Sequence, residues 1–207
     1  MKMYIVLMML LLVVACVPND TSIIPTATET TTPRSKKESY ARQFELDITH
    51  YLTAYNNKRW EDIIDITYPK VYGNKTRDEK IMQYIQAEMM GMLRITKLQK
   101  IEKISDIITD KGNLYAKIYF GADVVVALSG EMLEKKEYIK TNLELSYDTQ
   151  AVEFDEKLNA YTIKDAYVTM LAISEKGSNL WKYIEIDKQK EALLPQIIPA
   201  EILAQLD

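Results

Sequence analysis

Apolar residues recur at helical spacing soon after residue 40. Five of them lie three or four positions apart: Phe44, Ile48, Tyr51, Leu52 and Tyr55. On a helical projection they fall within about 100° of arc, which is typical of an amphipathic helix that packs on a core. We therefore predict a first helix that begins near Tyr40 and buries this stripe.

Two further helices are predicted after the first. The second runs from Trp60 to Tyr68 and ends at Pro69, because proline has no N–H to donate and the residue before it avoids the α region. The third begins after Thr76 and Glu79, which match a capping box, where both side chains bind free amides at a helix start. Its apolar stripe consists of Ile81, Tyr84, Ile85, Met89 and Met92.

After about Leu93 the apolar positions begin to recur every second residue, as in a strand. Residues 101–109 are rich in β-branched side chains, and the sequence Asp-Lys-Gly-Asn at 110–113 is a turn signal. Residues 114–128 then alternate between apolar and polar side chains. These segments predict an antiparallel hairpin.

Residues 131–147 fit two periods. Alternation typical of a strand is shown by Ile139, Thr141, Leu143, Leu145 and Tyr147. Helical spacing is shown by Met132, Ile139, Leu143 and Tyr147. Both interpretations stay open, and the contribution of Met132 favours the helix.

The rest of the chain predicts short strands and a helical tail. Strands are expected at 151–154, 161–163, 168–174 and 180–186, with a turn at 175–179 before the last one. The tail at 188–206 is helical but broken at Pro195, and Pro199 opens its last helix. Helices followed by an antiparallel meander predict an α+β fold, with N-terminal helices packed on a curved antiparallel sheet.

Two segments resemble a known superfamily. Tyr51-Leu-Thr-Ala-Tyr-Asn-Asn-Lys-Arg-Trp60 is a helix that ends in a polar turn and restarts at a bulky residue, and Trp181-Lys-Tyr-Ile-Glu185 is a late strand. Together they resemble the nuclear-transport-factor-like superfamily, the cone-shaped fold that ketosteroid isomerase shares. In ketosteroid isomerase-like enzymes an aspartate base and tyrosine donors lie inside the cone. No spacing selects an equivalent among the residues on predicted strands here, which include Asp106, Asp123, Asp165, Tyr115, Tyr119 and Tyr167.

The first residues indicate where the protein resides. Lys2 precedes an apolar run that ends at Ala15, which is the length of a signal-peptide core and short of the ~20 residues that a spanning helix needs. Val13-Val14-Ala15-Cys16 resembles the lipobox of bacterial lipoprotein precursors. The resemblance implies that residues 1–15 are removed and that Cys16 carries lipid on its sulfur and its new amino group. The alternative is an ordinary secretory signal with an incidental cysteine.

Lipid on Cys16 implies attachment to a membrane of the bacterial cell envelope, the outer membrane where the host has one. Three acyl chains hold a protein durably, whereas one holds it only marginally. Residues 16–39 are rich in threonine and proline without an apolar period, which predicts a tether, and residues 40–207 form a single domain. Cys16 is the only cysteine, so no disulfide forms, and the formal charge of −4 disfavours nucleic acid as a partner.

Few residues are candidates for chemistry. The chain has one histidine, His50, so a metal site with several histidine ligands is excluded. On the first helix His50 lies about 150° from the middle of the apolar stripe, which places it toward solvent. Glu88 falls inside the third stripe, and carboxylates desolvated in this way are suited to acid–base work. The competing interpretation is that Glu88 lies at the edge of the stripe or pairs with an arginine such as Arg94. No catalytic residue, metal ligand or cofactor is assigned.

Two classes of function follow. We expect a membrane-anchored envelope lipoprotein whose domain is a non-catalytic module that binds a partner protein or glycan. The alternative is a cone-cavity binder of a small apolar molecule, or an acid–base enzyme, that uses Glu88 or a strand aspartate. An enclosed pocket with a convergent carboxylate and donor would favour the second class, and an interior filled by side chains would favour the first.

Overall fold

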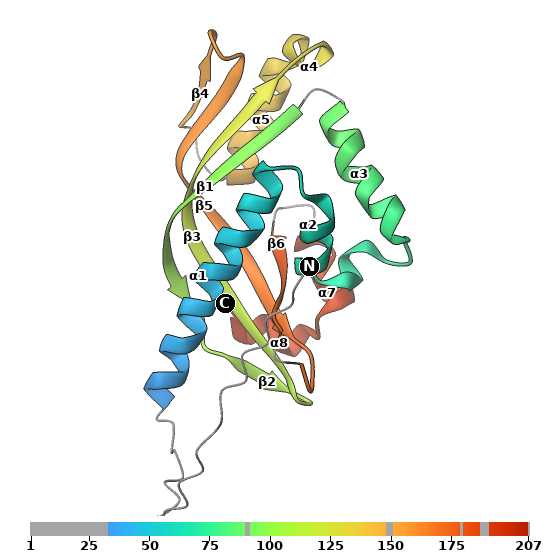
Figure 1. The fold of residues 1–207 in the computed structure, drawn as a ribbon. Coiled ribbons are helices and arrows are strands. Elements are labelled where there is room, and N and C mark those ends of the chain that lie inside the picture. Colours follow the sequence, from blue (N-terminus) through green and yellow to red (C-terminus); the bar gives the residue numbers. More distant parts are fainter. Residues whose placement is uncertain (1–32, 90–91, 148–150, 179, 187–190, 207) are drawn as a thin grey trace, which may run out of the picture.

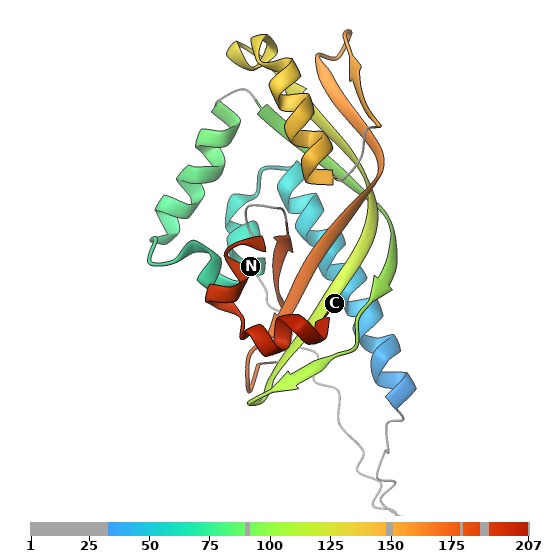
Figure 2. The same ribbon diagram turned by 180° about the vertical axis from the view of Figure 1, so that it is seen from behind.

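Helices packed on a curved antiparallel sheet make up the computed structural model, which confirms the predicted α+β class (Figures 1 and 2). The structure describes residues 33–89, 92–147, 151–178, 180–186 and 191–206. In these parts of the chain no helix is both long and apolar enough to cross a membrane.

The first helix is longer than predicted. α1 (Pro33–Asn56) begins at Pro33 and not near Tyr40, so residues 33–39 belong to the helix and not to the tether. Pro33 suits a first helical turn, because the N–H that it lacks would have no partner there. The predicted stripe is confirmed, since Phe44 and Ile48 are fully buried and the other members are buried or partly buried.

The second and third helices are confirmed in position. α2 (Trp60–Ile66) ends before Pro69, which opens the 3-10 helix η1 (Pro69–Tyr72). α3 (Arg77–Met89) has the predicted capping box: the Thr76 N–H donates to Glu79 Oε2 at 2.6 Å, and the Glu79 N–H donates to Thr76 Oγ1 at 3.3 Å.

The stripe predicted for the third helix is wrong at its C-terminal end. Met89 is 79% exposed, and Met92 begins a strand. The helix contacts α2 and that strand, and neither covers the Met89 side chain.

The sheet has six strands. Their order is β1 (Met92–Ile104), β3 (Asn113–Leu128), β5 (Ala160–Ser174) and β4 (Val152–Asp155), with β2 (Ile108–Asp110) paired to β3 and β6 (Lys182–Ile186) paired to β5. The predicted hairpin is confirmed, but its first strand begins at Met92 and not at residue 101. Lys111 and Gly112 have φ angles of 49° and 87°, as a tight two-residue hairpin turn requires.

A bulge joins two strands that the sequence predicts as separate. Residues 161–163 and 168–174 both belong to β5, and the register with β3 shifts between Ala122 and Val124. Asp165 has φ of 49°, and its N–H donates to Asp123 Oδ1 at 3.2 Å. A bulge bends a strand and reverses which side chains face inward, which explains why the alternation breaks here.

Helices cover both faces of the sheet. The helical interpretation of 131–147 is confirmed by α4 (Glu131–Glu134) and α5 (Lys136–Tyr147). α1 and α5 pack on one face, which we call the inner face, over Phe120 and Val126 respectively. α7 (Leu194–Ile197) and α8 (Ala200–Leu206) pack on the other, outer face. Pro195 lies in the first turn of α7 and begins that helix instead of breaking one.

Candidate functional site

A buried ion pair lies on the inner face of the sheet. Arg94 of β1 donates from Nη1 to Glu185 Oε1 at 2.6 Å and from Nη2 to Glu185 Oε2 at 2.8 Å. The arginine and glutamate side chains are 22% and 11% exposed. Glu185 belongs to β6, and β3 and β5 lie between β6 and β1. The pair therefore spans the inner face and links two strands that do not touch in the sheet.

Aromatic side chains enclose this ion pair. The Tyr51 hydroxyl of α1 donates to Glu185 Oε2 at 3.4 Å, and Arg94 Nη1 donates to the Tyr147 hydroxyl of α5 at 3.5 Å. The guanidinium lies 4.8 Å from the centroid of the Tyr55 ring, which is a cation–π contact. We call these residues (Arg94, Glu185, Tyr51, Tyr55 and Tyr147) the inner cluster.

A second layer of rings supports the inner cluster. Tyr84 of α3 stacks on Trp60 with centroids 5.3 Å apart and meets Tyr55 edge-on at 6.3 Å. Its hydroxyl shares a 2.9 Å hydrogen bond with that of Tyr72. The four N-terminal elements α1, α2, η1 and α3 thus contribute rings to one continuous aromatic wall.

Burial controls the electrostatics of the inner cluster. Burial raises the pKa of Tyr51 well above its ordinary value, and the charge on Glu185 raises it further. Burial disfavours the charged form of Arg94, but the charge and hydrogen bonds of Glu185 outweigh it and raise the pKa of the guanidinium. Both carboxylate oxygens of Glu185 accept hydrogen bonds from Arg94, so the ion pair joins β1 to β6 through two charge-assisted contacts.

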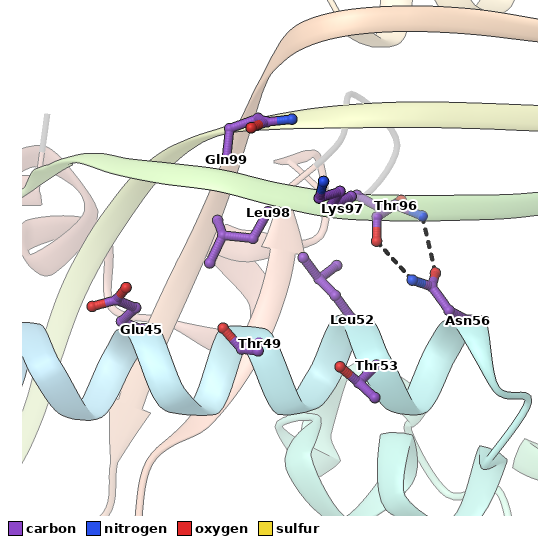
Figure 3. Close-up of a pocket in the computed structure, with 9 residues that line it drawn as sticks. All are labelled: Glu45, Thr49, Leu52, Thr53, Asn56, Thr96, Lys97, Leu98 and Gln99. Carbon is purple, nitrogen blue, oxygen red and sulfur yellow. Dashed lines mark hydrogen bonds between the residues drawn. The ribbon is translucent and has the colours of Figure 1, made fainter.

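A groove lies between α1 and the edge strand β1 (Figure 3). Its volume is about 300 Å³, and side chains such as Glu45, Thr49 and Gln99 give it polar walls. Asn56 closes one end, since its Nδ2 donates to the Thr96 carbonyl at 2.8 Å and the Thr96 N–H donates to its Oδ1 at 2.9 Å. The asparagine thus takes two backbone groups that another strand would otherwise pair with, which protects the edge of the sheet.

Of the candidates for chemistry, Glu88 and His50 lie apart from the inner cluster, and Cys16 lies outside the described residues. Glu88 is partly exposed and forms an ion pair with Lys58. This agrees with the competing interpretation that Glu88 lies at the edge of the stripe, although its cationic partner is Lys58 and the arginine named as an example, Arg94, binds Glu185 instead. His50 is exposed, as predicted, and its Nε2 lies 3.8 Å from Asp62 Oδ2. Cys16 and the predicted signal peptide lie outside the described residues.

Comparison with known proteins adds no assignment. No family model matches the chain, and no curated protein sequence matches it. Within the described ranges, no three histidine, cysteine or acidic side chains gather in a way that would hold a metal ion.

We predict that the ion pair is strongly coupled. Arg94→Met leaves a buried carboxylate without its partner and should lower the free energy of unfolding by about 3–5 kcal/mol, as should Glu185→Leu. The double variant removes both charges, so its loss should be well below the sum of the single losses. Urea denaturation of the four proteins measures this. Additive losses in the double variant would show that the pair is not coupled.

We also predict cooperative ionisation of buried tyrosines. Burial raises the pKa of Tyr51, Tyr84 and Tyr183, and the 2.5 Å hydrogen bond to Asp47 adds to this for Tyr183. An unfolded chain ionises its phenols near pH ~10, so the stability from these neutral phenols is complete below that pH and is lost as pH rises above it. An alkaline titration should therefore show tyrosinate absorbance rising together with loss of circular dichroism. Full ionisation before unfolding would contradict this.

Proposed function

We propose that the protein is a lipid-anchored component of the bacterial cell envelope whose domain is a non-catalytic binding module. The observation that carries the second part is the double hydrogen bond between Arg94 and Glu185. A general base must lie within hydrogen-bond reach of a substrate proton, and both oxygens of this carboxylate already accept hydrogen bonds from Arg94. Much of the remaining inner face is occupied by packed side chains such as Phe44, Phe120 and Tyr183, which are almost fully buried.

The anchor is proposed from the sequence between Met1 and Cys16, where a short apolar run ends in a lipobox-like tetrapeptide. Because α1 begins at Pro33, the tether would consist of residues 16–32. A flexible chain of that length has a typical span of about 20–25 Å, which would keep the domain near the membrane without embedding it. Where the host has an outer membrane, we propose that membrane as its location.

The helices on a curved sheet also support a proposed kinship with the nuclear-transport-factor-like superfamily. In such a cone the inner face is the place where a ligand cavity would form. Here the inner cluster occupies that place with its own charges already neutralised, which favours a structural interior over a cavity.

We predict that Cys16 is the site of lipid attachment. Growth of expressing bacteria with labelled palmitate should label the protein and place it in the membrane fraction, and Cys16→Ser should remove both properties. Ser22→Ala, in the same segment, should leave them unchanged. Equal labelling of the Cys16→Ser protein, or no labelling of the unchanged one, would rule out the anchor.

We predict that the folded protein has no saturable site for an apolar ligand. Titration with the fluorophore anilinonaphthalene sulfonate should give weak, non-saturating fluorescence, because packed side chains fill much of the inner face in the described part of the chain. Saturation at one fluorophore per protein would instead favour the alternative class, a cone-cavity binder. Lysozyme of the same concentration serves as a packed control.

A further inference from the structure

α3 is packed less tightly than the other long helices. None of the α3 side chains that the structure describes is fully buried, and Met82 and Met89 are exposed. Every other described helix of seven residues or more has at least one buried side chain, such as Phe44 in α1, Ile63 in α2, Ile139 in α5 and Ile202 in α8. α3 lies at the margin of the molecule, where it contacts α2 and β1 (Figures 1 and 2).

Tyr84 provides the most extensive aromatic contact between α3 and the rest of the domain. Its ring stacks on Trp60 with planes inclined by 7° and meets the Tyr55 ring edge-on. Its hydroxyl shares a hydrogen bond with that of Tyr72, and the Lys80 ammonium lies 5.1 Å from the centroid of the Tyr72 ring. α3 therefore packs as a separate layer on rings that belong to α1, α2 and η1.

Two ion pairs hold the ends of this layer. Arg77 in the first turn of α3 donates from Nη1 to Asp65 Oδ1 at 2.6 Å, and Glu88 in the last turn binds Lys58. The four side chains are 32–61% exposed. Ion pairs at such sites contribute little to stability, because water and salt compete for both charges. A segment with few buried contacts and exposed ion pairs can separate from a domain at a lower free energy than global unfolding requires.

The segment before α3 can change conformation without loss of packing. Residues 73–76 are exposed, and Gly73 has φ of 59° and ψ of −133°, a combination that is readily adopted only by glycine. A Cβ at Gly73 would have no atom within 4 Å. The capping box of Thr76 and Glu79 is local to α3, so the helix retains it when it moves.

We propose that α3 is a lid over the aromatic wall, which opens as one unit while α1 and the sheet stay folded. Tyr55, which the Tyr84 ring meets, is also the ring on which the Arg94 guanidinium packs. Nε of Arg94 is buried without a hydrogen-bond acceptor among the described residues, and such an N–H gains free energy when an acceptor reaches it. Opening of α3 removes one layer from beside Tyr55 and shortens the path of water to the inner cluster. This inference goes beyond the proposed function and does not depend on the lipid anchor.

Hydrogen exchange of the full chain in detergent, over a series of low denaturant concentrations, tests the lid. The amides of residues 81–89 should share one free energy of opening and exchange at least about 100-fold faster than those of residues 44–55, after correction for intrinsic rates. Tyr84→Ala removes the stacked ring and should speed exchange in α3 at least about tenfold further, without changing α1. Arg77→Gln, a milder change, should speed it about twofold to fivefold. Tyr138→Ala, at a tyrosine 71% exposed on α5, should have no effect on α3.

Three outcomes would overturn the inference. Exchange of the α3 amides only with global unfolding would show that the helix is part of the core. Rates that rise gradually toward the helix ends would show fraying instead of opening as a unit. Equal acceleration of α1 and α3 in both the Tyr84→Ala and the Arg77→Gln proteins would show that these side chains stabilise the whole domain. Cys16→Ser tests the anchor without a change in α3, so failure of the proposed function and failure of the lid are distinguishable.

Discussion

The packing of the domain depends on pairing two charged side chains, Arg94 and Glu185, inside it. Removing a carboxylate and a guanidinium from water costs several kcal/mol per ion, and the bidentate geometry of Arg94 and Glu185 is what offsets this. The geometry requires β1 and β6 to be in place, and α1 and α5 add Tyr51 and Tyr147, whose hydroxyl groups contact Glu185 and Arg94. A shift of either strand by one residue would turn its charge to the outer face. We infer that the pair specifies strand register even where its net contribution to stability is small.

The sheet bends so that these groups can meet. β1 and β3 change register twice, between Leu98 and Lys100 and between Ile101 and Lys103, and β3 and β5 change once more near Asp165. Each bulge adds local twist and bends its strand. Such bending brings the ends of a sheet closer across its inner face. The left-handed conformation of Asp165 is compensated locally, because its N–H has the Asp123 carboxylate as acceptor.

Local features of the fold were predictable from the sequence, and the candidate site was not. The stripe on α1, the capping box at Thr76 and the turn at 110–113 each depend on residues a few positions apart. Arg94 and Glu185 are 91 residues apart, and no local period reports such a contact. The inward orientation of Glu185 could have been predicted, because Glu185 alternates with the buried Trp181 and Tyr183 along its strand. The inward position of Arg94 could not, because the helical period of α3 runs almost directly into β1. That continuity placed Arg94 near a helix end in the prediction.

Tyrosine side chains lie on both faces of the sheet, and the two faces differ in the charged groups next to these rings. On the inner face the guanidinium near Tyr55 is already neutralised by a carboxylate, so it offers little attraction to a further ligand. On the outer face the ring of Tyr119 has two ammonium groups near it and stacks on Tyr167, which is half exposed. A contact between a cation and a ring contributes more where both are removed from water than at an exposed site. The inner rings therefore help to hold a buried charge in place, whereas the outer rings lie at the boundary with solvent, where such contacts contribute less.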